Sequence, residues 1–230
     1  MKKYICSIVF LLVVVQGFTQ QVKGSWKRDL DTAVQYLTIV DNYFSIATFD
    51  FKEKKFIRTR GGTAIFHDGK MEGIIEFNTS NKSEVKSPYS YEIKVKGKKL
   101  MLPAENISMV WDAVDDASDA LSGNWRITGR EQDGKIVEMK PGARKTIKIL
   151  SGTRFQWIAI NTETGEFFGT GGGNYSFVNG KYTENIEFFS RDSNRVGASL
   201  GFNAELKNGD WHHSGLSSKG DKIYEVWSRK

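Results

Sequence analysis

One segment of this chain occurs twice, and the two occurrences align without a gap at a constant offset of 111 residues. Residues 44–77 read FSIATFDFKEKKFIRTRGGTAIFHDGKMEGIIEF, and residues 155–188 read FQWIAINTETGEFFGTGGGNYSFVNGKYTENIEF. Eleven of the 34 aligned pairs are identical, among them a Gly pair, an F-x-x-G-K turn and the closing I-E-F. Internal similarity of this length indicates a tandem duplication, so we expect two copies of one scaffold.

The repeat extends beyond this match in both directions. Gly24-Ser25-Trp26 matches Gly123-Asn124-Trp125 at an offset of 99, so the second copy carries twelve extra residues (111 − 99), which we place in 131–143. Each copy ends in a similar aromatic strand, Met109-Val110-Trp111 in the first and Glu225-Val226-Trp227 in the second. These matches predict the domain boundaries: a first copy over 22–111, an acidic linker over 112–122 and a second copy over 123–230.

The first 20 residues have the pattern of a secretory signal peptide. Lys2 and Lys3 precede an apolar stretch from Ile5 to Val15, and small or polar residues follow. Because this stretch is too short to cross a bilayer as a helix, we expect no stable membrane span and a protein that is exported, either periplasmic or secreted. Cys6 is the only cysteine and lies in this segment, so the exported chain has no disulfide and no thiolate ligand.

The charges of the chain are interspersed. The formal net charge of +6 falls to +4 when the two lysines of the signal peptide are removed, and no run of five or six basic residues occurs. Nucleic-acid binding needs a concentrated basic face, so we expect no nucleic-acid partner.

Short alternating runs separated by turn pairs indicate β-strands in both copies. Phe155, Trp157 and Ala159 alternate with Gln156 and Ile158 in one such run. Turn pairs separate the runs at Asp68-Gly69, Asn179-Gly180 and Asn208-Gly209. The chain has 3 prolines and 23 glycines, and no segment after residue 20 shows helical periodicity over three turns. Several short antiparallel strands in each copy predict an all-β fold, either a sandwich or a closed barrel.

The Gly-x-Trp sequence at the start of each copy, followed by regular hairpins, resembles the lipocalin and fatty-acid-binding (calycin-like) superfamily of β-barrels. The second copy is similar to lipocalin-like domains of exported Bacteroidetes proteins of unassigned function, through GGGNY at 171–175, GKYTE at 180–184 and WHHSG at 211–215. The resemblance covers most of the second copy and fades in the first. It implies two tandem small antiparallel lipocalin-like barrels after the signal peptide.

The resemblance also implies structural roles for Trp26, Trp125 and Arg229. In that superfamily the Trp of Gly-x-Trp closes one end of the barrel, and a basic residue near the last strand often packs over it. Trp125 and Arg229 match this pattern in the second copy. In the first copy Trp111 is followed by Asp112, with no arginine nearby, so the pattern is incomplete there.

Differences between the copies place the candidate site in the second. Several of its polar or aromatic residues stand opposite apolar or small residues of the first copy: Trp157 opposite Ile46, Tyr175 opposite Ala64, Tyr182 opposite Met71, Glu184 opposite Gly73 and His213 opposite Leu102. Alternation puts Glu184 on the face of its strand that carries Tyr182 and Ile186, and puts Trp211 on the same face as His213.

We expect these residues to line the interior of the second barrel. An eight-strand barrel has room for packed side chains or for one small ligand. The lining suits a small lipophilic or aromatic molecule with one polar end. The predicted ligand-binding residues are Trp157, Tyr175, Tyr182, Glu184, Trp211 and His213.

Metal and cofactor sites are not predicted. His212 and His213 are adjacent on a strand and point to opposite faces, so they cannot bind one ion together, and His67 lies in the other copy. The glycine-rich stretch 169–173 lacks the Lys-Ser/Thr that a phosphate loop requires, and no nucleophile motif occurs. No catalytic residue is therefore assigned.

The sequence thus predicts non-catalytic binding of a small lipophilic or aromatic ligand, centred on the second copy. One alternative is a protein-interaction or envelope-structural module, with a protein partner and with both barrels filled by side chains. A third interpretation is an enzyme in which Glu184 and His213 act as general acid and base.

Overall fold

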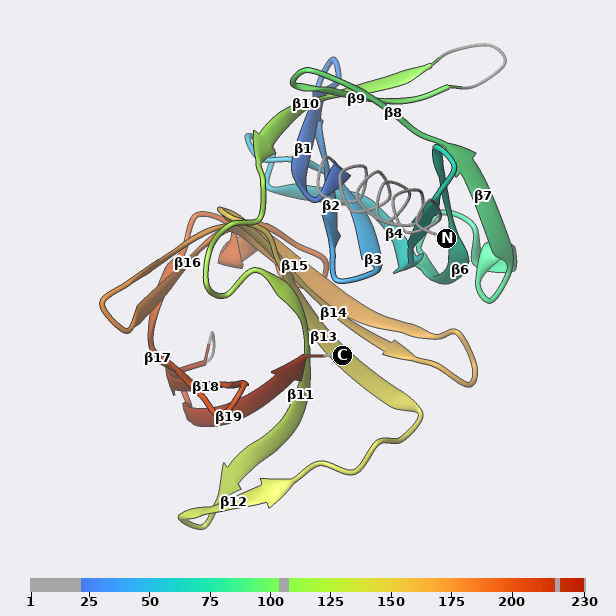
Figure 1. Ribbon diagram of the computed structural model, residues 1–230. Coiled ribbons are helices and arrows are strands. Elements are labelled where there is room, and N and C mark those ends of the chain that lie inside the picture. The colour runs from blue at the N-terminus through green and yellow to red at the C-terminus, as the bar shows by residue number, and fades with distance from the viewer. Residues whose placement is uncertain (1–21, 104–107, 218–219, 230) are drawn as a thin grey trace, which may run out of the picture.

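The computed structural model describes residues 22–103, 108–217 and 220–229 (Figure 1). The expected signal peptide over 1–20 lies outside the described residues. Within the described ranges, 19 strands form two antiparallel sheets, accompanied by two short 3-10 helices, η1 (Lys82–Glu84) and η2 (Ser193–Arg195). No helix in this part of the chain is long and apolar enough to cross a membrane.

The first sheet comprises the strands of the first copy. They are β1 (Gly24–Asp29), β2 (Val34–Val40), β3 (Tyr43–Asp50), β4 (Lys55–Thr63), β5 (Ile65–His67), β6 (Lys70–Asn78), β7 (Pro88–Glu92), β8 (Lys94–Lys96), β9 (Lys99–Leu102) and β10 (Met109–Asp115). Their order is β5-β6-β4-β3-β2-β1-β10-β9-β8, and β7 also pairs with β6. The strand is interrupted at Ile93, which lies between β7 and β8. As a result β7 pairs with β6, whereas β8 pairs with β9. The first sheet is therefore a curled half-barrel.

The second barrel comprises the strands of the second copy. They are β11 (Gly123–Gln132), β12 (Lys135–Glu138), β13 (Arg144–Leu150), β14 (Arg154–Asn161), β15 (Phe167–Val178), β16 (Lys181–Phe189), β17 (Ser199–Lys207), β18 (Asp210–Leu216) and β19 (Lys222–Arg229). Eight of them follow one another around a ring that closes where β11 pairs with β19. Here β17, the equivalent of β7 and β8, is one strand that pairs with both β16 and β18.

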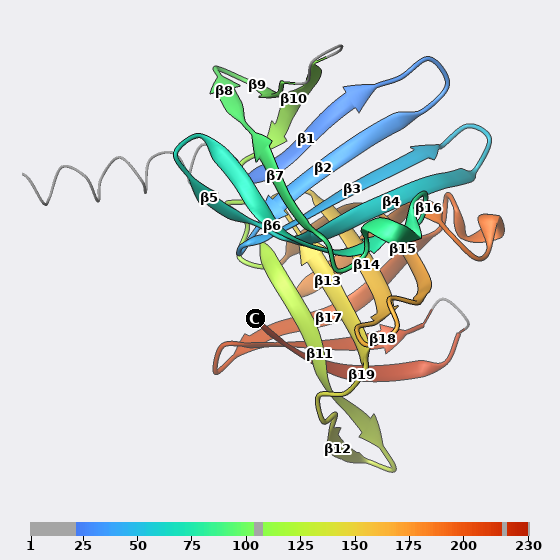
Figure 2. The same ribbon diagram turned by 90° about the vertical axis from the view of Figure 1, so that its right-hand side faces the viewer.

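The prediction of an all-β chain built from two tandem barrels is confirmed, because the second copy closes into a barrel and the first curls into half of one. The extra residues of the second copy lengthen β11 and add β12. This hairpin projects at the lower end of the molecule, away from the first sheet (Figure 2). Every residue of β12 is exposed.

Tight turns with left-handed central residues join many of the strands. Both central residues have positive φ at Asp68-Gly69, Asp133-Gly134, Asn179-Gly180 and Asn208-Gly209. This geometry is that of the type I′ turn, whose twist matches the twist of the flanking strands. Asn and Asp tolerate positive φ and glycine adopts it without a steric cost, which explains why these pairs occur at the hairpins.

A repeated glycine allows two strands of each copy to cross closely. A Cβ placed on Gly62 would lie 2.0 Å from the carbonyl oxygen of Ile74, and one placed on Gly173 would lie 1.9 Å from that of Asn185. The register of the strand pair shifts at these glycines in both copies. The Gly pair that the copies share is therefore required by close packing of backbone on backbone.

The first part of the expected linker belongs to the first sheet. β10 continues to Asp115, and its register pairs Trp26 with Ala113 and Ser25 with Asp115. The acidic residues do not prevent this pairing, because Asp112 points outward to Lys99, 2.7 Å away. The connection between the copies is thus shorter than the 112–122 that the composition suggested.

The outer faces of the two copies pack against each other (Figure 1). Two buried apolar clusters combine residues of both copies, one containing Tyr43, Phe77, Ile147, Ile149, Ile158 and Ile160 and the other Ala47, Phe49 and Phe188. Strands β2, β3, β13 and β14 are therefore largely buried on both faces, since one face lines the interior of a copy and the other lies in this contact.

Candidate functional site

The second barrel contains a cavity of about 370 Å³. Most of its wall is apolar and includes Trp157, Ala159, Ile186, Phe189, Leu200 and Ile223. Four further lining residues are polar and almost fully buried: Lys148, Glu184, His213 and Glu225, hereafter the polar cluster. Small-molecule sites typically combine an apolar wall with a few polar groups in this way.

Lys148 and Glu184 form a buried ion pair in the polar cluster. Nζ of Lys148 on β13 donates to Oε1 of Glu184 on β16 at 2.7 Å, and each residue is 5% exposed. The hydroxyl of Tyr182 donates to the same carboxylate oxygen at 2.9 Å. Nζ of Lys148 also lies 5.1 Å from the ring centres of Trp211 and Trp227, so aromatic faces surround the ammonium.

His213 on β18 is 2% exposed and lacks a hydrogen-bond partner among the described residues. Its Nδ1 lies 3.7 Å from Oε2 of Glu225, which is too long for a hydrogen bond. Burial lowers the pKa of His213, and the Lys148 ammonium lowers it further, while Glu225 and Glu184 act in the opposite direction. The imidazole is therefore neutral at neutral pH, with one nitrogen a donor and the other an acceptor.

Glu225 on β19 is charged and paired on its outer side. Oε2 accepts a hydrogen bond from the indole of Trp227 at 3.1 Å, and Oε1 lies 3.1 Å from Nη2 of Arg130. Burial raises the pKa of Glu225, but His213, Lys148 and Arg130 outweigh this effect and hold the pKa below its usual range. With Arg130 included, the polar cluster thus contains two ion pairs and one neutral imidazole.

Packed aromatic residues close the barrel below the polar cluster. The register between β18 and β19 pairs Trp211 with Trp227 and, one inward-facing position further, His213 with Glu225. Trp211 packs edge-on against Trp125 at 5.9 Å and against Tyr182 at 5.0 Å. The polar cluster therefore lies at the inner end of the cavity, directly above this aromatic base.

Arg229 lies over the ring of Trp125, with its guanidinium carbon 4.7 Å from the ring centre, the contact that the resemblance implies. The indole of Trp125 donates to the carbonyl of Leu121 at 2.8 Å. Trp26 makes the same contact in the first copy, donating to the carbonyl of Val22 at 3.0 Å. Both tryptophans are buried and anchor the start of their copy.

The predicted ligand-binding residues separate into two groups. Trp157, Glu184 and His213 line the cavity. Tyr175, Tyr182 and Trp211 belong to the packed core of the second barrel and do not line this cavity. Tyr175 is held there by hydrogen bonds to the carbonyl of Ser151 at 2.5 Å and to Asp119 at 3.0 Å. His212 points to the opposite face of β18 and contacts the hydroxyl of Tyr224 at 3.0 Å.

Sequence reasoning did not identify Lys148 and Glu225. In the segment IKIL at 147–150, alternation puts Lys148 on the face of the strand opposite Ile147 and Ile149. Ile147 and Ile149 pack against the first copy, and Lys148 faces the interior of the barrel. A signal was available, because the repeat puts Lys148 opposite Leu37 and Glu225 opposite Met109.

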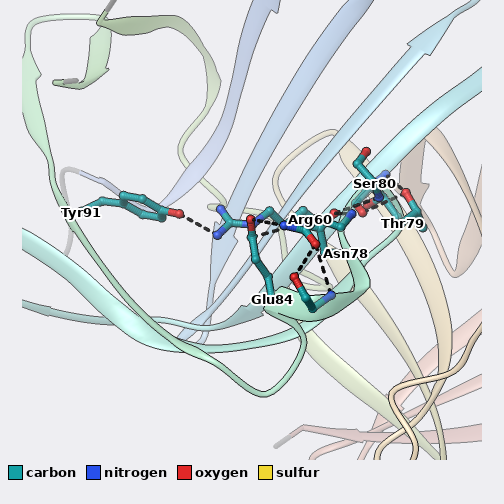
Figure 3. Close-up of polar contacts among 9 residues, drawn as sticks. Arg60, Asn78, Thr79, Ser80, Glu84 and Tyr91 are labelled. Atoms are coloured by element: carbon teal, nitrogen blue, oxygen red, sulfur yellow. Dashed lines mark hydrogen bonds and ion pairs between the residues drawn. The ribbon is translucent and has the colours of Figure 1, made fainter. Parts of the chain in front are cut away.

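The first sheet has a polar group of different character. The guanidinium of Arg60 donates to the hydroxyl of Tyr91 at 2.6 Å and to Glu84 at 3.0 Å, and Asn78 donates to the same carboxylate at 3.1 Å (Figure 3). These side chains satisfy one another and tie η1 and β7 to β4. The hydrogen bonds of this group therefore account for its presence in the fold, whereas the buried imidazole of His213 has no such hydrogen bonds among the described residues.

The arrangement in the second barrel can enclose an apolar molecule and offer it a hydrogen bond at the inner end. Glu184 and His213 line the same cavity, but Glu184 is engaged by Lys148 and Tyr182, and the closest carboxylate to His213 is Glu225. No cluster of three or more metal-ligating His, Cys, Asp or Glu occurs among the described residues. Compared with known proteins, the chain matches no family model and no curated protein.

Proposed function

We propose that this protein binds a small, mostly apolar molecule in the cavity of the second barrel without transforming it. The observation that carries the proposal is a cavity of about 370 Å³ whose apolar wall leads to a buried polar cluster. Binding sites for small molecules commonly have volumes of roughly 300–1,000 Å³ and a few convergent polar groups.

The polar cluster supports a binding role because the scaffold does not need it. At the equivalent positions the first copy has Leu37, Gly73, Leu102 and Met109. Buried ion pairs contribute little net stability, and apolar residues of similar volume are often as stable or more stable. Four buried polar residues in one copy alone therefore favour a function over a purely structural role.

The proposal retains two expectations that come from the sequence alone. The N-terminal pattern favours export, and the resemblance favours a lipocalin-like protein. In such a protein a barrel interior that holds a ligand needs no catalytic group. The fixed pairing of Lys148 with Glu184 agrees with this, because a carboxylate held by an ammonium and a phenol is poorly placed to move protons.

Extraction of the purified protein with organic solvent, followed by mass spectrometry, tests the proposal. We expect a bound small molecule of low polarity, or binding of a neutral apolar dye such as N-phenylnaphthylamine to the protein after extraction. Trp157 and Trp227 line the cavity, so a bound dye should quench their fluorescence.

A matched pair of substitutions on β17 assigns the site. Leu200→Trp fills the cavity and should abolish dye binding, whereas Leu206→Trp changes an exposed residue of the same strand and should leave it intact. Retention of dye binding in folded Leu200→Trp protein, or absence of both a bound molecule and dye binding, would contradict the proposal.

A further inference from the structure

Together with Arg130, the polar cluster has balanced charges. Lys148 is paired with Glu184 at 2.7 Å, and Glu225 is paired with Arg130 at 3.1 Å. The remaining member, His213, is neutral. The centre of its ring lies 4.1 Å from the ring centre of Phe202 and 5.2 Å from that of Trp211. The cluster and Arg130 together therefore have no net charge to offer a ligand.

An ionised group of a ligand would not find a counter-charge at the inner end of the cavity. A carboxylate there would approach Glu184 and Glu225, and the two cations beside them are already engaged. An ammonium would approach Lys148. Burying a charge without a free partner is strongly unfavourable, whereas an uncharged polar group needs only a hydrogen bond.

His213 can supply that hydrogen bond. Its side chain is almost fully buried, lines the cavity and has no hydrogen-bond partner among the described residues. Buried polar groups in folded proteins are nearly always paired, so a buried imidazole without a partner indicates a role outside the fold. A neutral imidazole can accept a hydrogen bond from a hydroxyl or an amide, or donate one to a carbonyl.

We infer that the cavity selects an uncharged ligand whose inner end is a hydroxyl, carbonyl or amide group, and that this end forms a hydrogen bond with His213. The inference rests on the proposed binding function and specifies the chemistry of its ligand. The apolar wall then surrounds the hydrocarbon or aromatic part of the molecule. Arg144, which also lines the cavity, is exposed and lies where the cavity meets solvent.

Competition between simple amphiphiles tests the inference. N-phenylnaphthylamine reports occupancy of the cavity, and decanol, decanoate and decylamine, which share one chain length, compete with it. We expect decanol to displace the dye at concentrations at least about tenfold lower than the other two, since each factor of ten requires about 1.4 kcal/mol.

The two neighbouring histidines provide matched variants. His213→Leu introduces the residue found at the equivalent position of the first copy. It should raise the concentration of decanol needed to displace the dye, and so weaken the preference for decanol, while decanoate and decylamine remain poor competitors. His212→Leu changes the residue that faces Tyr224 outside the barrel and should leave the preference unchanged. An unchanged far-UV circular dichroism spectrum shows that each variant remains folded.

The outcomes distinguish the inference from the proposed function. If the dye does not bind, both are overturned. If the dye binds but decanoate displaces it as well as decanol does, the function stands and the inference is wrong, and the charged group then lies near Arg144. If His213→Leu retains the full preference for decanol, the assignment to His213 is overturned.

Discussion

Gln156 in the second barrel contacts Ser45, the residue that occupies the same position in the first copy. Oγ of Ser45 donates to Oε1 of Gln156 at 2.5 Å. Nε2 of Gln156 donates to the hydroxyls of Thr59, at 3.0 Å, and Thr170, at 2.9 Å, which are also equivalent in the repeat. A residue that contacts its own equivalent lies close to a twofold axis, so the copies are related as the subunits of a symmetric dimer are.

The apolar contacts between the copies follow the same relation. Phe49 stacks on Phe188 with ring centres 4.7 Å apart. Their equivalents in the repeat are Ile160 and Phe77, and these two belong to one buried cluster on the other side of the contact. The reciprocal arrangement is that of an isologous interface, here formed within one chain.

The first prediction concerns Gln156 at the centre of this contact. Gln156→Ala removes three buried hydrogen bonds and leaves Ser45, Thr59 and Thr170 with fewer partners. The free energy of unfolding should fall by about 1–3 kcal/mol, the usual cost of leaving buried polar groups unpaired. Urea denaturation measures this change. Gln132→Ala is the control, because Gln132 is exposed at the end of β11 and its removal should have little effect; equal effects of the two substitutions would exclude a special role for Gln156.

A second prediction concerns the close crossing at Gly173. Gly173→Ala places a Cβ 1.9 Å from the carbonyl oxygen of Asn185, and this rigid backbone atom cannot move without opening the β15–β16 pair. Overpacking of this kind costs about 1–3 kcal/mol or more. Gly142→Ala is the control, since no atom lies within 4 Å of its Cβ position. A thermal unfolding temperature that drops only for Gly173→Ala supports the prediction, and an unchanged temperature would contradict it.

Much of the fold could be predicted from the sequence because the repeat and the turn pairs are local signals. The duplication predicted two copies, and Asn179-Gly180 and similar pairs predicted the hairpins. The end of the first copy was less accurate, because the composition of residues 112–115 is acidic and only pairing with β1 makes them a strand. The break at Ile93 likewise depends on how β7 and β8 pair with other strands.

The candidate site was predicted only in part because the contact between the copies changes the meaning of alternation. Ile147, Ile149 and Ile158 are buried by the other copy, so their apolar character does not identify the side that faces the barrel interior. Lys148 was overlooked for this reason. Glu184 and His213 were found because they stand opposite Gly73 and Leu102 of the first copy. Comparison of the copies was thus a better guide than the hydrophobic pattern of one strand.

A third prediction concerns the buried ion pair of Lys148 and Glu184. Lys148→Met leaves the carboxylate of Glu184 buried without its cation, and Glu184→Gln leaves the ammonium without its anion. Each single substitution should lower the free energy of unfolding by about 3–5 kcal/mol. The double substitution removes both charges and should cost much less than the sum of the two. Additive effects in denaturant unfolding would contradict an ion pair that acts as a unit.

The last prediction concerns the pH dependence that His213 imposes. Lys148, Glu184 and Glu225 face this imidazole from β13, β16 and β19, and burial together with Lys148 lowers its pKa against the effect of the carboxylates. The unfolded chain therefore takes up a proton at His213 before the folded chain does. The stability that the neutral imidazole contributes is complete above about pH 6.5, the ordinary pKa of histidine, and is lost as the pH falls through the lower folded-state pKa.

Denaturant unfolding of the protein and of His213→Leu across this pH range measures the effect. As the pH falls below about 6.5, the unfolding free energy of the protein should fall more than that of the variant. The reason is that only the protein has a buried imidazole at position 213 to protonate. His212→Leu is the control: His212 is partly exposed beside Tyr224, so its removal should leave the acid sensitivity unchanged. If His213→Leu loses stability on acidification as steeply as the protein does, another group is responsible and the neutral, unpaired state of His213 is wrong.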